Sequence, residues 1–257
     1  MTIKAITFDF WSTLYRGKTI DFSQRLLRLK TAIEQSSGVT VQFEQLQAAV
    51  ELARDTWNRT WVEQYRTMDA ADWLRVILNE LALSLAANDF DQIQTKMETS
   101  VLHELPTLVP EAREVLAALA ADHKLALISD TGITPGRVLR QILEKDDIVG
   151  YFSQLTFSDE VGRSKPHPDA FLTTLYTLGA RPSQAVHVGD LLRTDIAGAQ
   201  RVNMRAVQYV GINYDQGAST LNSQDTMITP DAVIENHAEL LTLLPQWHNG
   251  IKPGGLS

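Results

Sequence analysis

The chain has no cysteine among its 257 residues. This absence excludes disulfides, thiolate nucleophiles, cysteine-ligated zinc and iron–sulfur clusters, so any metal would bind oxygen or imidazole. The chain also lacks an uninterrupted run of about 18 apolar residues and a leader with a charged and then an apolar segment. We therefore expect a cytoplasmic protein with no membrane partner.

Positive charge is scarce as well. The 23 lysine and arginine residues stand against 31 aspartate and glutamate residues, which gives a net charge of −8 with neutral histidine. No segment is rich in lysine or arginine. A protein that binds a phosphate backbone needs a positive field, so we expect no nucleic acid partner. The composition leaves the oligomeric state open.

Short β-branched and aromatic segments recur along the chain, and amphipathic helical segments separate them. This alternation predicts an α/β fold with a Rossmann-like, doubly wound parallel sheet, in which ligands bind beyond the carboxyl ends of the strands. The predicted strands are residues 3–8, 124–129, 155–158, 185–189, 205–210 and 232–234. The predicted helices of this α/β part are residues 111–121, 135–143, 168–178 and 195–201.

The alternation stops between about residues 20 and 105, where the chain contains only amphipathic helical segments. We therefore predict an all-helical cap domain at residues 20–105, inserted after the first strand, with residues 1–19 and 106–248 forming the catalytic core. Residues 249–257, rich in glycine and proline, predict a flexible tail. Apolar residues recur with a helical period within residues 21–34, 43–61, 70–86 and 90–103.

Polar side chains stand where predicted strands end. Asp9, Ser129 and Asp190 end or follow strands, and Lys165 lies in a loop before a helix. Because the carboxyl ends of parallel strands meet at one edge of a sheet, we expect these side chains to share a pocket. Two carboxylates there repel each other unless a cation joins them, and hard oxygen ligands suit Mg²⁺, which usually acts on phosphates. The lysine and the serine would donate hydrogen bonds to anionic oxygens.

Four motifs occur in order at these positions, and with them the chain resembles the haloacid dehalogenase superfamily of hydrolases. They are DFWSTL from Asp9, Ser129 at the end of LALIS, Lys165 within EVGRSKPHPDAF, and GDLLRTD with Asp190 and Asp195. The resemblance covers roughly residues 3–245. It implies that the helical insertion is the type-one cap of that family.

The resemblance also implies a reaction. In the family the first aspartate attacks phosphorus and forms an aspartyl-phosphate, which assigns catalysis to Asp9, Ser129 and Lys165. Ser129, Thr131 and Lys165 would bind the substrate phosphate. The implied function is a Mg²⁺-dependent phosphatase that acts on a small phosphorylated metabolite.

The same resemblance implies a set of ligands for the Mg²⁺ cofactor. Asp9, Asp190 and the backbone carbonyl of Trp11 would hold the ion, and Asp195 would support it directly or through water. With Mg²⁺ and Lys165 neutralising the phosphoryl charge, attack by a carboxylate is chemically reasonable.

Trp11 departs from the phosphatases of the family, which carry a second aspartate two positions after the nucleophile. That aspartate protonates the leaving group, whereas an indole N–H only donates a hydrogen bond and exchanges no proton near neutral pH. Loss of a general acid or base slows a reaction by about 10²–10⁴-fold. Alkyl phosphates are therefore expected to be poor substrates unless another group supplies the proton.

Two other functions remain open. An aromatic residue at position 11 also resembles the dehalogenase branch, in which a halide leaves without a proton, so a metal-independent 2-haloacid dehalogenase is one alternative. That branch has neutral residues where this chain keeps Asp190 and Asp195, which favours phosphoryl chemistry. The other alternative is a regulatory protein that binds phosphate but has lost turnover.

An aromatic stripe in the predicted cap allows two interpretations. Trp57, Trp61 and Tyr65 follow one another at the spacing of one helix face. Such a stripe more often packs in a core than contacts a substrate, and the sequence allows either role. Arg193 lies near the predicted pocket and is either a substrate contact or a surface charge. His187, inside a predicted buried strand, is interpreted as structural.

Overall fold

The centre of the protein is a six-stranded parallel sheet. The computed structural model describes residues 2–17, 22–212 and 227–248, so the predicted cap start near residue 20 and the predicted tail 249–257 lie outside them. The strand order is β5-β4-β1-β6-β7-β8, and every neighbouring pair is parallel. This confirms the predicted α/β fold. The strands are β1 (Ala5–Phe8), β4 (Lys124–Ser129), β5 (Phe152–Phe157), β6 (Ala185–Gly189), β7 (Arg205–Tyr209) and β8 (Ala232–Ile234).

Helices cover both faces of the sheet, which is why its inner strands are almost continuously apolar. On one face, Ile6 and Phe8 of β1 belong to an apolar cluster that includes side chains of three helices. On the other face, Ala5 belongs to a cluster with two helices. The first three helices are α5 (Ala112–Ala120), α6 (Gly136–Lys145) and α10 (Leu240–His248), and the other two are α8 (Pro168–Leu178) and α9 (Ala197–Arg201).

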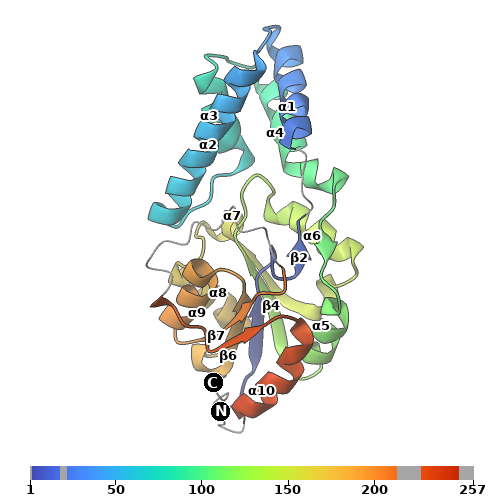
Figure 1. Ribbon diagram of the computed structural model, residues 1–257, viewed down its shortest axis with the longest axis vertical. Coiled ribbons are helices and arrows are strands. Elements are labelled where there is room, and N and C mark those ends of the chain that lie inside the picture. The colour runs from blue at the N-terminus through green and yellow to red at the C-terminus, as the bar shows by residue number, and fades with distance from the viewer. Residues whose placement is uncertain (1, 18–21, 213–226, 249–257) are drawn as a thin grey trace.

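The helices between β1 and β4 form a separate group above the sheet in Figure 1. We call this group, residues 22–103, the helical insert. It has an apolar cluster of its own, to which Leu46, Leu74 and Ile93 contribute. The chain leaves and re-enters the sheet region through an antiparallel pair, β2 (Tyr15–Arg16) with β3 (Thr107–Leu108). The insert comprises α1 (Phe22–Ser37), α2 (Phe43–Gln64), α3 (Ala70–Glu80), α4 (Ala87–Thr99) and the 3₁₀ turn Ser100–His103.

Several predicted elements differ from the structure in their bounds, and three of these differences are instructive. The helix predicted at 70–86 ends at Glu80, and Ala82 is left-handed with φ 52°. Apolar residues continue beyond that point because the following segment still packs on the cluster of the insert. The strand predicted at 155–158 is β5, and polar residues at its beginning are tolerated because β5 is an edge strand. The helix predicted at 195–201 divides into a π-helical turn, Leu192–Ile196, followed by α9.

The strand pair β2 and β3 was not predicted, and neither were two helices. The helix α7 (Ser158–Val161) follows β5 directly, and α10 covers one face of the sheet near the described end of the chain. Among the residues that the structure describes, no helix is both long and apolar enough to cross a membrane.

Candidate active site

The predicted site residues stand at the carboxyl edge of the three central strands. Asp9 follows β1, Ser129 ends β4 and Asp190 follows β6, and these strands are neighbours in the order β4-β1-β6. Lys165 lies in the loop between α7 and α8. Its ammonium donates to Oδ1 of Asp9 at 2.5 Å and to Oδ1 of Asp195 at 2.7 Å. The fold thus joins groups that lie 156 and 30 positions apart in the sequence.

Lys165 is a buried cation, with an exposed fraction of 2%. Burial alone would lower the pKa of its ammonium. The carboxylates of Asp195, Asp9 and Asp130 outweigh this and raise the pKa above its usual range. The lysine therefore stays charged and can neutralise a bound anion.

Asp195 is held on both of its oxygens. Oδ1 accepts from Lys165 and from Nε2 of His187 at 3.0 Å, and Oδ2 accepts from the backbone N–H of Leu191 at 3.0 Å. Burial alone would raise its pKa, but Lys165 and His187 hold it below the usual range. A Cβ on Gly189 would lie 2.3 Å from Cγ of Asp195, so only glycine permits this close approach.

A hydrogen-bonded chain extends behind this carboxylate into the sheet. Thr7 and His187 are opposite each other on β1 and β6, and the threonine Oγ1 lies 2.8 Å from Nδ1 of the histidine. The carboxylate of Asp195 can only accept, so Nε2 carries the hydrogen and Nδ1 accepts from the threonine hydroxyl. Burial lowers the pKa of His187, which keeps the ring neutral. The chain runs from Thr7 through His187, Asp195 and Lys165 to Asp9.

Three carboxylates of this site converge. Asp9, Asp190 and Asp195 each offer an oxygen atom, and these atoms lie within 4.8 Å of one another. Burial raises the pKa of Asp9 to about 7, although the ammonium of Lys165 lowers it in part. Burial and repulsion by Asp195 and Asp9 raise the pKa of Asp190 well above its usual value. A cation between the carboxylates would relieve this repulsion, so the residues present fit a metal site.

The remaining predicted residues lie around this cluster. Ser129 is buried at the end of β4, and its Oγ makes a long hydrogen bond of 3.3 Å to the carbonyl of Asp130. Thr131 is also buried, but its hydroxyl donates to Asp159 at 2.9 Å, which gives it a structural partner. Trp11 lies in the tight loop after β1, with its ring against that of Phe10 at 4.8 Å.

The aromatic stripe of α2 contacts the core through Trp61. Its indole Nε1 donates to Oδ2 of Asp130 at 2.9 Å, and the guanidinium of Arg193 lies 4.3 Å from the centre of its ring. Trp57 stacks on Trp61 with ring centres 5.1 Å apart. Trp61 therefore joins the helical insert to the core. The helical spacing of the stripe did not predict this contact, and packing within the insert alone does not account for it.

The sequence analysis did not predict that Asp130 belongs to this site. Its Oδ1 accepts from the backbone N–H of Lys165 at 2.9 Å while Oδ2 accepts from Trp61. The available signal was its place, directly after Ser129 at a strand end. The links of His187 to Asp195 and to Thr7 were missed too, and a titratable residue in an otherwise apolar buried strand was the signal there.

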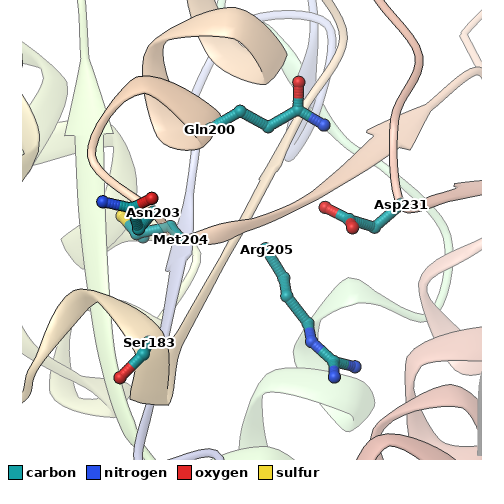
Figure 2. A pocket seen from close by; sticks show the side chains of 6 residues that line it. All are labelled: Ser183, Gln200, Asn203, Met204, Arg205 and Asp231. Atoms are coloured by element: carbon teal, nitrogen blue, oxygen red, sulfur yellow. The ribbon is translucent and has the colours of Figure 1, made fainter.

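A surface pocket of about 290 Å³ lies at the opposite edge of the sheet, by the amino ends of β6, β7 and β8 (Figure 2). Its two charged groups have structural partners: the Arg205 guanidinium stacks 4.5 Å from the ring centre of Trp247, and Asp231 accepts from the N–H of Ala206. This pocket therefore contributes nothing to the carboxylate cluster. It is lined by Ser183, Gln200, Asn203, Met204, Arg205 and Asp231.

Comparisons with known proteins agree with this arrangement. Residues 3–203 match the family described as haloacid dehalogenase-like hydrolase. The chain is 27% identical to the glyceraldehyde 3-phosphate phosphatase of Methanopyrus kandleri, over 94% of this chain and 97% of that protein. It is 33% identical to the phosphoglycolate phosphatase of Photorhabdus laumondii, but over only 53% of this chain and 55% of that protein.

A solved structure is also similar. The crystal structure of the 2-haloacid dehalogenase from Pseudomonas syringae pv. Tomato DC3000 superimposes with a TM-score of 0.69 and 25% identity, over 96% of this chain and 100% of that chain. The family match covers well over half of the chain and includes Asp9, Ser129, Lys165 and Asp190. The chain therefore belongs to the haloacid dehalogenase-like hydrolase family.

Proposed function

We propose that the protein is a Mg²⁺-dependent phosphatase that acts on a small phosphorylated metabolite through an aspartyl-phosphate on Asp9. The observation that carries this proposal is the convergence of Asp9, Asp190 and Asp195, two of which, Asp9 and Asp195, bond to the ammonium of Lys165. Three carboxylates and one ammonium leave an excess of negative charge, which a divalent cation would balance before a phosphate binds. The relatives that are named as phosphatases support the same reaction.

The metal site would use the ligands that the acidic cluster offers. Asp9, Asp190 and the backbone carbonyl of Trp11 would hold the ion. Asp195, with its oxygens bonded to Lys165, His187 and Leu191, would support the site by orienting the lysine. When bound, Mg²⁺ supplies charge neutralisation and polarises the phosphoryl oxygens.

The chain's own residues perform the other steps. Asp9 attacks phosphorus as a carboxylate, while Lys165 and Ser129 donate hydrogen bonds to the phosphoryl oxygens. Lys165 stays charged at all working pH values and so removes the repulsion between the nucleophile and its target. The cap predicted at residues 20–105, of which the helical insert is the described part, would exclude water and select the substrate.

Dehalogenation of a 2-haloacid is the second candidate. The aromatic ring of Trp11 and the similarity to a solved 2-haloacid dehalogenase favour it. In that reaction Asp9 would attack carbon, and halide would leave without a proton. The acidic cluster disfavours it, because without a cation Asp190 and Asp195 would repel the carboxylate of the haloacid.

A substrate screen separates the two candidates. Aryl phosphates, sugar phosphates and short 2-haloacids are supplied with millimolar Mg²⁺ or with a chelator, to wild type, Asp9→Asn and the control Asp91→Asn at an exposed site in α4. The proposal expects phosphate release only with Mg²⁺, and none from Asp9→Asn. Halide release that persists in the chelator would instead establish the dehalogenase. A folded wild type that releases neither product would overturn both reactions.

A further inference from the structure

The proposed reaction lacks a proton donor at the usual place. An alkoxide leaving group must be protonated as its bond to phosphorus breaks, and Trp11 cannot do this. The donor has to lie on the far side of the phosphorus from Asp9, because the attacking and leaving oxygens are roughly in line. Asp9 stands at the edge of the sheet, so the far side is the side of the helical insert (Figure 1).

Asp130 is the carboxyl group that reaches this side. It follows Ser129 at the end of β4, which pairs with β1 beside Asp9. Its Oδ1 is bonded to the backbone of Lys165, and its Oδ2 is bonded to Trp61 of the insert. Asp130 therefore lies between the residues proposed to hold the phosphate and the helices proposed to cover the leaving group.

We propose that Asp130 is the general acid and base of this site, in the place of the aspartate that Trp11 replaces. This inference rests on the proposed phosphatase function. The other three carboxylates already have proposed roles: Asp9 is the nucleophile, Asp190 would hold the metal, and Asp195 orients the lysine. Both contacts of Asp130, by contrast, come from groups that only orient it. Its Oδ2 faces the insert and would carry the transferable proton.

The two half-reactions balance with this single group. In the first, an oxygen of Asp9 forms a bond to phosphorus, the bond to the leaving oxygen breaks, and that oxygen takes the proton from Oδ2 of Asp130. In the second, the carboxylate of Asp130 takes a proton from water as the water oxygen bonds to phosphorus. The bond between phosphorus and Asp9 then breaks, which releases phosphate and restores both carboxyl groups.

The surroundings of Asp130 allow its carboxyl group to be either protonated or ionised near the working pH. Burial raises the pKa of Asp130 to about 6, opposed by the Lys165 ammonium and the Trp61 N–H. Asp195, in the turn after β6, adds a smaller upward effect, and Asp9 is a further negative charge within range. A group with a pKa near the working pH exchanges protons most effectively.

Substitution by asparagine tests the proposal with little change of shape. Asp130→Asn keeps an acceptor for the Lys165 N–H but removes the acidic proton. Wild type and variant are compared on a series of phosphate monoesters that runs from p-nitrophenyl phosphate to alkyl phosphates. We expect kcat/KM on alkyl phosphates to fall by about 10²–10⁴-fold, and that on p-nitrophenyl phosphate by much less, because nitrophenolate leaves without a proton.

Two further readouts separate proton transfer from a structural role. Rapid acid quench of Asp130→Asn with p-nitrophenyl phosphate should trap more phosphoenzyme than wild type, because the base for the second step is missing. In wild type the alkyl phosphate rate should fall above the pKa of Asp130, and Trp61→Phe should move this fall to higher pH, since the lost N–H had lowered that pKa. The second readout does not depend on whether Asp130→Asn folds.

Each outcome decides one question. Equal losses on aryl and alkyl phosphates, or an alkyl rate as high as that of wild type, would overturn the role of Asp130 while the phosphatase stands. An unchanged pH profile in Trp61→Phe would also count against it. Failure of wild type to release phosphate from any ester or to form a phosphoenzyme would instead overturn the proposed function itself.

Discussion

The carboxylate cluster of the core and the helical insert are held in different ways. In the core, Lys165 is buried and bonds at 2.5 and 2.7 Å to two carboxylates, one of which continues to His187. The insert instead has an apolar cluster of its own. Polar contacts join it to the core: Trp61 with Asp130, Thr67 with Ser158, the carbonyl of Tyr65 with the N–H of Ser164, and an ion pair of Glu98 with Arg137 of α6.

This difference bears on which part of the protein carries the reacting groups and which part chooses the substrate. Asp9 and Lys165 are fixed by the end of β1 and by buried charge pairs, so they keep their positions whatever the insert does, whereas Asp130 also contacts the insert through Trp61. Apart from the ion pair of Glu98 with Arg137, these polar contacts of the insert are single hydrogen bonds, which can break at small cost when a substrate enters or leaves. Attack by Asp9 should therefore depend on the core, whereas proton transfer by Asp130 and the choice of substrate should also depend on the insert.

The largest expected effect comes from removing the buried cation. Lys165→Met leaves the buried carboxylates of Asp9 and Asp195 facing each other without the ammonium between them, and we expect a loss of about 3–5 kcal/mol in the free energy of unfolding. The matched control is Lys30→Met in the insert, where a partly exposed ion pair with Glu34 should contribute much less to the free energy of unfolding. Denaturant titration measures both. Equal losses would contradict the contrast between the two regions.

Metal binding should have the next largest effect. If millimolar Mg²⁺ is about 100 times its dissociation constant, it adds about 2.7 kcal/mol, or about 5–10 °C in Tm for a chain of this size. Asp190→Asn should remove most of this increase. It should also raise Tm without metal, because it relieves repulsion at Asp9 and Asp195. Calorimetry with and without Mg²⁺ checks both, and a Tm indifferent to Mg²⁺ in wild type would argue against the metal site.

Two substitutions of His187 isolate its contact with Asp195. A glutamine amide reaches the place of Nε2 and can still donate to Asp195, whereas an asparagine amide reaches only the place of Nδ1, beside Thr7. We expect His187→Asn to lower kcat by about 10–100-fold, as for other residues that orient a catalytic or metal-binding group, and His187→Gln to lower it less. Steady-state kinetics at saturating Mg²⁺ measure this. The reverse order would show that the contact with Thr7 matters more.

The smallest effect on stability is expected at the contact between Trp61 of the insert and Asp130 of the core. Trp61→Phe keeps the ring that packs on Trp57 but loses the N–H bonded to Asp130, at a cost of about 1 kcal/mol for this half-exposed contact. Its neighbour Val62, exposed on α2, provides the control Val62→Ala. We expect Trp61→Phe to change the relative rates on different phosphate esters, while Val62→Ala leaves them as in wild type. If neither variant alters those relative rates, Trp61 only packs the insert.

The same contrast explains how far the sequence could predict the structure. Asp9, Ser129 and Asp190 end or follow buried strands, and parallel topology alone predicts that such groups share one edge. The contact of Lys165 with Asp195 needs a loop and a π-helical turn; the motif resemblance assigned both residues to one site but did not predict this contact. These positions depend on the sheet, which the apolar segments predict well.

Other features depend on tertiary contacts that no periodicity records. The spacing of Trp57 and Trp61 predicts one helix face, but not whether that face meets its own cluster or another part of the protein. The end of α3 at Glu80 was missed because apolar residues continue beyond it in a segment that packs without being helical. The pairing of Thr7 with His187 follows from strand order, which the sequence does not state.

The most direct test of the central claim is the identification of the residue that becomes phosphorylated. Wild type is mixed with p-nitrophenyl phosphate and Mg²⁺, quenched in acid within the first turnover and digested for peptide mass spectrometry. The account predicts one phosphoryl group on the peptide that contains Asp9, and none in Asp9→Asn or in the presence of a chelator. Turnover without this adduct, or a phosphoryl group on any other residue, would contradict the account.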